Sequence, residues 1–177
     1  MKKLLTAIIL GIALTGVSLA QNLSKGLNGK SATPRIAVVE FGDGSGSMTA
    51  EAKRQLQSSI AFALVKNREF EVPDVRNTRA ASGGPNISPS AAVKLGKQLG
   101  VNYVLIGTVT EYSTTGGRMT VNTQLVDVAT GRVKLSGDTT GESTSAMTIR
   151  AGHAEMSVKV VKPLIEKLKA SISAAVD

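Results

Sequence analysis

The chain has a single histidine, His153, which is the side chain best suited to acid–base catalysis. A zinc site would need several His, Cys or carboxylate ligands, and Glu155 is the only such residue beside it. A nucleophilic serine would be expected in a Gly-x-Ser-x-Gly turn after a strand, and no such turn follows a strand in the right way. We therefore interpret His153 as a residue on a helix surface, and we predict no catalytic residue and no metal ligand.

A glycine-rich loop, Gly42 to Ser47, lies between a predicted strand and a predicted helix, where phosphate-binding loops also lie. It lacks the Gly-Lys-Ser/Thr ending whose lysine and hydroxyl would hold phosphate and magnesium. Asp43 would repel a phosphate, although backbone N–H groups at the helix start could hold a carboxylate or sulfate weakly. We interpret this segment as a structural loop and predict no cofactor.

The aromatic residues and the charges bear on nucleic-acid binding. Each aromatic side chain falls inside or at the end of a predicted element, so all five are interpreted as core: Phe41, Phe62, Phe70, Tyr103 and Tyr112. A single-strand-binding surface would need exposed aromatics among basic residues. The net charge of +8 comes from scattered Lys and Arg, which favours a solvated basic surface that approaches anionic envelope surfaces. No nucleic-acid partner is predicted.

Residues 1–20 are predicted to be a cleaved signal peptide. Lys2 and Lys3 precede an apolar run from Leu4 to Leu19, and Ser18-Leu19-Ala20 provides the small-x-small cleavage pattern before Gln21. An uncleaved membrane anchor is the alternative, but the run is shorter than the roughly 20 apolar residues that span a bilayer. We expect a periplasmic protein, peripheral to the outer membrane, with no stable transmembrane insertion.

The rest of the chain is predicted to form a polar, flexible leader, residues 21–34, and one domain, residues 35–177. Because the chain has no cysteine, we expect neither a lipid-bearing N-terminal Cys nor a disulfide. A domain of this length can bury a sufficient core without such staples.

The predicted fold is α+β, with the order β-α-β-α-β-β-β-α and helices packed on a mixed sheet. Strands are predicted at 35–41, 70–72, 103–109 and 119–125 and from 133 onward, helices at 49–64 and 88–99, and a surface loop at 80–87. Ser88-Pro89 and Gly100 are typical of a helix start and end.

The C-terminal segment is predicted to be an amphipathic helix, kinked or restarted at Pro163. Its apolar residues recur every four positions, at Met156, Val160, Leu164, Leu168 and Ile172. The stripe could lie on a membrane or a partner. We favour packing on the chain's own sheet, which two helices would not cover.

Four segments, Arg35 to Phe41, Leu95 to Val104, Gly107 to Tyr112 and Leu125 to Val133, together resemble the periplasmic domain of the curli-secretion CsgG family. The penicillin-binding-protein activator LpoB and the N-terminal domain of TolB share this type of fold. The resemblance covers about residues 35–141. It implies a non-enzymatic envelope protein that acts through protein contacts, without a cofactor, and it leaves a homo-oligomer open.

Two functions follow from the resemblance. The first is a CsgG-type adaptor of curli secretion or assembly. The second is an LpoB-like activator that docks on a peptidoglycan synthase. A subunit of an outer-membrane secretion channel is a weaker third, because only Ser113 to Gly117 separate two predicted strands, whereas a membrane hairpin needs about 9–11 residues per strand.

Overall fold

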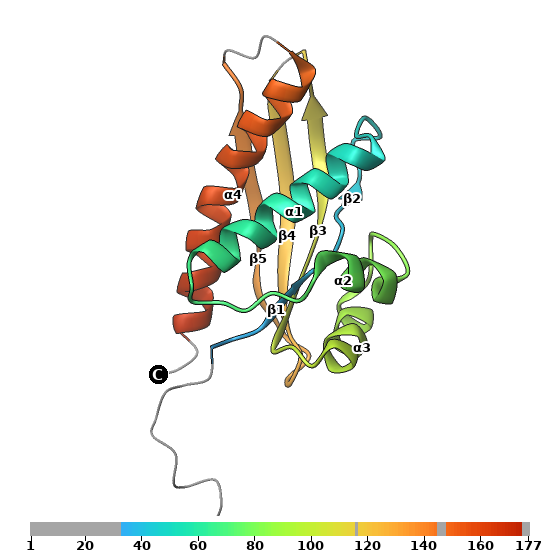
Figure 1. Ribbon diagram of the computed structural model, residues 1–177, viewed down its shortest axis with the longest axis vertical. Coiled ribbons are helices and arrows are strands. Elements are labelled where there is room, and N and C mark those ends of the chain that lie inside the picture. Colours follow the sequence, from blue (N-terminus) through green and yellow to red (C-terminus); the bar gives the residue numbers. More distant parts are fainter. Residues whose placement is uncertain (1–32, 116, 145–147, 175–177) are drawn as a thin grey trace, which may run out of the picture. The chain divides into compact units, whose positions relative to one another are not determined.

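A computed structural model of the chain describes residues 33–115, 117–144 and 148–174 (Figure 1). These residues form, in chain order, β1 (Ile36–Val38), β2 (Gly42–Asp43), α1 (Ala50–Lys66), α2 (Val75–Ser82), α3 (Pro89–Leu99), β3 (Tyr103–Ser113), β4 (Arg118–Asp127), β5 (Val133–Glu142) and α4 (Ile149–Ser173). The predicted signal peptide and leader residues 21–32 lie outside the described residues. None of the helices described combines the length and apolar character that crossing a bilayer requires.

The strands form one mixed sheet in the order β1-β3-β4-β5, and β2 also pairs with β3. β1 and β2 run parallel to β3, with Ala37 beside Val104 and Gly42 beside Thr108. β3, β4 and β5 form an antiparallel meander. The predicted α+β fold with helices on a mixed sheet is confirmed.

Each face of the sheet carries its own apolar core, because successive residues of a strand point to opposite faces. On β3, Leu105 and Val109 belong to the core under α1 and α4, whereas Val104 and Ile106 belong to the core under α3. Figure 1 shows α1 and α4 lying in front of the sheet. These two helices therefore form one outer layer.

The predicted helix starts and ends agree with the structure. Thr49 accepts a hydrogen bond from the backbone N–H of Ala52 at the start of α1, and Ser88 does the same for Ala91 in α3. Gly100 ends α3 in the left-handed conformation, with a φ of 62°. Such caps satisfy helix-end groups that have no partner within the helix.

α4 packs its apolar stripe on the sheet, as the sequence predicts. Met156, Val160, Leu164, Leu168 and Ile172 are all buried. The predicted restart of the helix at Pro163 does not occur, since α4 runs through this residue as one helix. Pro163 lies on the exposed side, so its ring displaces none of the buried stripe.

Two local predictions between α1 and α3 are wrong. The strand predicted at 70–72 is reduced to a single parallel bridge between Arg35 and Glu71. The surface loop predicted at 80–87 is wrong only at its start: residues 80–82 belong to α2, a helix that was not predicted, while residues 83–87 are loop. α2 lacks a helical apolar stripe and buries only Thr78, so periodicity gives no signal for it.

α2 is instead held by a polar network. Arg79 makes an ion pair with Glu40 at 3.0 Å and donates to the side-chain oxygen of Gln57 at 2.7 Å. Gln57, fully buried on α1, donates in turn to the carbonyl of Val38 at 2.9 Å. α2 is thus tied to β1 and α1 by residues distant in sequence.

Candidate functional site

His153 is not on the surface, and that prediction is wrong. Its side chain is 3 % exposed, its ring lies edge-on to Tyr112 at 5.7 Å between centroids, and Nε2 lies 3.4 Å from the hydroxyl of Ser157. Burial lowers the pKa of His153 from its usual value, which keeps the ring neutral. Glu155 bonds instead to Ser143 and Lys159, at 2.7 and 3.0 Å.

The Gly42–Ser47 loop is organised around Asp43. The Asp43 carboxylate accepts hydrogen bonds from the backbone N–H groups of Ser45, Gly46 and Met48, and from the Ser45 hydroxyl. Burial acts to raise the pKa of Asp43, but these bonds together lower it. The donors that could cradle an external anion are therefore used by the loop's own carboxylate.

Among the described residues, Phe62 is the largest exposed apolar side chain, and its prediction as core is wrong. The buried stripe of α1 runs through Leu56, Ile60 and Leu64. At about 100° per residue, Phe62 lies about 200° around the helix from Ile60, on the opposite side. Its side chain is 69 % exposed. The sequence did indicate that Phe62 is exposed, since this residue falls outside the periodic apolar stripe of the helix.

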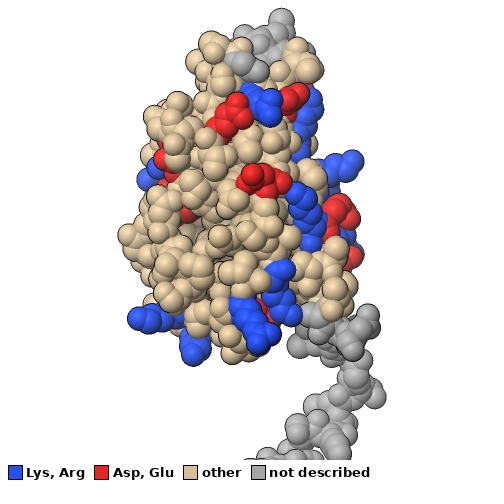
Figure 2. All heavy atoms as spheres, turned by 180° about the vertical axis from the view of Figure 1, so that it is seen from behind, with Lys and Arg blue, Asp and Glu red and all other residues tan. Residues whose placement is uncertain are grey.

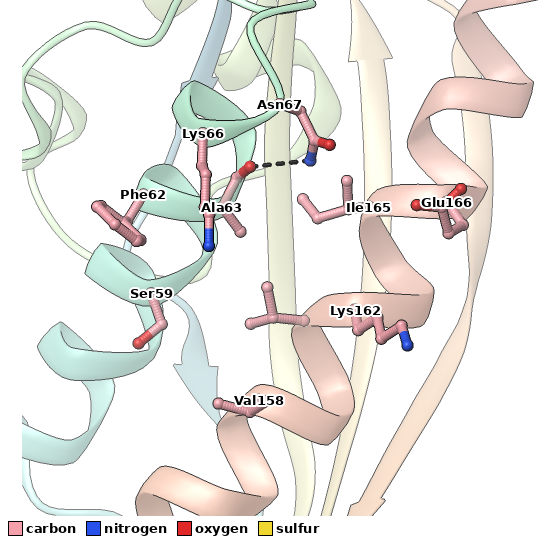
Figure 3. Close-up of a pocket in the computed structure, with 10 residues that line it drawn as sticks. Ser59, Phe62, Ala63, Lys66, Asn67, Val158, Lys162, Ile165 and Glu166 are labelled. Carbon is pink, nitrogen blue, oxygen red and sulfur yellow. Dashed lines mark hydrogen bonds between the residues drawn. The ribbon is translucent and has the colours of Figure 1, made fainter.

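Phe62 borders a groove between α1 and α4, which we call the α1/α4 groove. It has a volume of about 510 Å³ and is lined mainly by apolar atoms. Figure 3 shows Ile165 pointing from α4 toward α1, where Ala63 lies. The lining residues are Ser59, Phe62, Ala63, Lys66, Asn67, Val158, Val161, Lys162, Ile165 and Glu166.

The floor and the margins of the α1/α4 groove differ in exposure. Val161 and Ile165 are 6 % and 3 % exposed and belong to the core. Val158, on the α4 margin, is 65 % exposed. The chain thus leaves large apolar side chains in solvent on both of the facing helices, the arrangement expected of a contact surface.

Two of the three charged residues that line the groove are basic. Lys66 lies on α1, and Lys162 and Glu166 lie on α4. Among the described residues, neither Lys66 nor Lys162 has a carboxylate within 4.0 Å, whereas Lys159 pairs with Glu155 and Lys169 with Glu69. Two lysine ammonium groups, one on each wall, are therefore available to a bound partner.

A model of the family described as FlgO protein matches residues 17–144. The chain belongs to the FlgO family. The match covers β1 to β5 and α1 to α3, and it ends before α4. No curated protein matches the chain.

The FlgO match overturns the predicted membership of the CsgG family. The segments that suggested CsgG mark features of the fold. Gly100 supplies the left-handed end of α3, and Asp127 accepts backbone hydrogen bonds from Ala129 and Thr130 in the turn after β4. Such turn residues are typical of the fold. Because several families share this fold, these residues do not identify one family.

Solved structures share the fold. PelC from Paraburkholderia phytofirmans, a dodecamer, is 24% identical with a TM-score of 0.52, over 74% of this chain and 87% of PelC. The LpoB C-terminal domain from Salmonella enterica is 21% identical with a TM-score of 0.51, over 66% and 87%. Lipoprotein GNA1162 from Neisseria meningitidis is 22% identical with a TM-score of 0.50, over 78% and 96%.

The FlgO family match supports the expectation of a protein of the cell envelope, whereas the solved structures, all under 25% identical, show the fold alone. Figure 2 shows the side behind the groove, where uncharged residues cover most of the surface and Lys and Arg lie toward one side and the lower edge. A smaller hollow of about 260 Å³ lies on that face of the sheet, beside Thr108 and Asn122. That hollow has no charged residue in its lining, so the α1/α4 groove is the stronger candidate of the two.

Proposed function

We propose that this FlgO-family protein is a non-enzymatic docking protein of the periplasm, and that it binds another envelope protein through the α1/α4 groove. The observation that carries the proposal is Phe62, a phenylalanine left 69 % exposed beside an apolar groove. Large aromatic side chains next to pockets are typical hot spots of protein interfaces.

The contacts of the reactive groups support a non-enzymatic role. His153 is buried against Tyr112 and Ser157, and the carboxylate of Asp43 is engaged by its own loop. His153 also lines a hollow of about 450 Å³ with Tyr112 and Arg150, but its side chain is 3 % exposed, so it offers little surface to a substrate.

The position of the groove supports docking without refolding. Both of its walls are helices whose opposite sides are buried in the core, so they present a preformed surface. A preformed surface reduces the entropy lost when a partner binds. Replacing Phe62 should weaken a partner's binding strongly and leave the fold intact.

We further propose that the partner is a peptidoglycan synthase. It follows the expectation attached to LpoB-like proteins, and the LpoB C-terminal domain has the same fold as this chain. The fold likeness itself says nothing about where the synthase would bind. The groove is our assignment.

An affinity pull-down from crosslinked envelopes tests this proposal. The full chain would be compared with Phe62→Asp and with Val133→Asp, a matched control at a 42 % exposed residue of β5 outside the groove lining. A fluorescent penicillin would reveal captured synthases. We expect capture by the wild-type chain and by the Val133 variant, and a loss of about tenfold or more for the Phe62 variant.

Two results would refute the proposal at different levels. If the Phe62 variant captures the same envelope proteins as the wild type, the groove is not the docking site. If capture depends on Phe62 but no penicillin-labelled protein is found, the docking role stands and the synthase is the wrong partner.

Self-assembly is a second candidate, favoured by the likeness to PelC, whose structure is a dodecamer. Light scattering coupled to size exclusion would give the native mass of the full chain. A mass of several subunits that is unchanged by Phe62→Asp would assign assembly to another surface. A monomeric mass at high protein concentration would rule self-assembly out.

A further inference from the structure

We infer that the occupant of the α1/α4 groove is an amphipathic helix with acidic flanks, supplied by the partner protein. This inference rests on the proposed docking function and specifies the chemistry of the partner. The shape of the groove and the charges on its two walls support this occupant.

The shape of the groove suits a helix. Two helices lie side by side on the sheet and leave an apolar channel between them, floored by Val161 and Ile165. The side chains of a third helix can enter such a channel as ridges enter a groove. Phe62 and Val158, exposed on opposite margins, would then contact the apolar face of that helix.

The charges on the walls of the groove indicate which side chains flank the apolar face of this helix. Lys66 stands on the α1 wall and Lys162 on the α4 wall, and among the described residues neither has an ion-pair partner. A helix lying between the walls brings its two flanks near one lysine each. Carboxylates on both flanks would therefore be attracted, while Glu166 disfavours a carboxylate near its own position.

The chain's own leader is a poor occupant. Residues 21–32 contain Lys25 and Lys30 and no acidic residue, so their charge has the same sign as that of the two unpaired lysines. A second copy is also disfavoured, because each copy would bring two unpaired lysines and only one carboxylate, Glu166, to a symmetric contact between the grooves. A partner with acidic flanks meets neither objection.

A membrane surface is a poor occupant for a different reason. An anionic bilayer would satisfy the lysines, but the apolar residues line a hollow of about 510 Å³. A bilayer surface is broad, so it would reach the margins of the groove and leave the floor unfilled. Ile165, 3 % exposed on that floor, marks the part that only an inserted side chain can reach.

Two synthetic peptides test the inference directly. Both are 18-residue helices with the same leucine face, one flanked by Glu and the other by Lys. Binding to the purified full chain is measured by calorimetry and by NMR shifts of residues in α1 and α4. We expect the Glu peptide to bind about tenfold more tightly, with an affinity that falls as salt increases.

A charge reversal provides the matched control. The double variant Lys66→Glu and Lys162→Glu should reverse the peptide preference. The double variant Lys94→Glu and Lys97→Glu changes the net charge equally, but on α3, and should leave the preference unchanged. Equal effects of the two double variants would overturn the inference, because the attraction would then come from total charge.

The remaining outcomes separate this inference from the proposed function. If Phe62→Asp abolishes partner capture while the reversal at Lys66 and Lys162 does not, docking stands and the acidic helix is wrong. Tighter binding of the Lys peptide would also overturn it. Binding to anionic lipid vesicles that Phe62→Asp abolishes, without binding of either peptide, would overturn it in favour of a membrane.

Discussion

Replacing Gly141 of β5 by alanine should destabilise the protein, because α4 crosses β5 too closely there for a Cβ atom. An added Cβ would lie 2.3 Å from the backbone oxygen of Met156 and 3.0 Å from the backbone nitrogen of Val160. Both atoms belong to the backbone of α4, so the helix itself would have to move. This helix is the second wall of the α1/α4 groove.

Gly137, four residues earlier on the same strand, provides the comparison, since a Cβ added there would have no heavy atom within 4 Å. Alanine is favoured over glycine in a strand interior by about 0.5–1 kcal/mol, and both variants gain this amount. Overpacking typically costs about 1–3 kcal/mol, and only Gly141→Ala incurs it. The difference between the variants therefore isolates the contact with α4.

Thermal and urea unfolding, followed by circular dichroism, would measure this difference. At about 2–4 °C per kcal/mol for a chain of this size, Gly141→Ala should melt about 2–12 °C below Gly137→Ala. Equal melting temperatures for the two variants would refute the close approach of α4 to β5. The geometry assigned to the groove would then be wrong as well.

Three further perturbations test the polar contacts of the fold. Arg79→Met should lower the free energy of unfolding, measured in urea, by about 2–4 kcal/mol, because it leaves the Glu40 carboxylate, 9 % exposed, without its ion-pair partner. Arg76→Met, which removes the exposed ion pair with Asp74, should change this free energy little. Burial lowers the folded-state pKa of His153, so the unfolded chain binds the proton first as pH falls below 6.5. The free energy of unfolding of the wild type should therefore decrease in this range, by at most about 1.4 kcal/mol per pH unit more than that of His153→Phe. Urea titrations at several pH values would measure this difference. Asp43→Ala should cost about 1–3 kcal/mol at pH 7, and this difference from the wild type should shrink as acid protonates Asp43, whose folded-state pKa lies below 3.8.

The elements that sequence patterns predicted are those with local signals. α3 begins after Ser88 and ends before Gly100, because a side-chain cap and a left-handed glycine each act within a few residues. The stripe of α4 repeats every four residues, so its buried side follows from the sequence alone. Local chemistry was sufficient in both cases.

The elements that the sequence analysis missed depend on distant residues. α2 is fixed by Arg79, whose partners are Glu40, in the connection between β1 and β2, and Gln57, on α1. The predicted strand at 70–72 fails because Glu71 alone pairs with the extended segment before β1. Propensity and periodicity describe one segment at a time, and these contacts join several.

The candidate site was misjudged for a different reason, since both errors came from residue type. Phe62 was assigned to the core as an aromatic residue, although its place on α1 is opposite the buried stripe. His153 was assigned to the surface as a lone histidine. It lies three residues before Met156 and seven before Val160, the spacing of one helix face, and it is buried with them. In each case helical position outweighs residue type.

The two sides of α4 have separable roles. The buried side, through residues such as Met156 and Leu164, fixes the helix on the sheet. The exposed margin, with Val158 and Lys162, makes up part of the groove. Substitutions on that margin should change the free energy of unfolding by no more than about 0.5 kcal/mol. The fold can therefore be kept while the margin changes. For the proposed docking function, a variant of this margin that alters capture without altering melting would identify a docking residue.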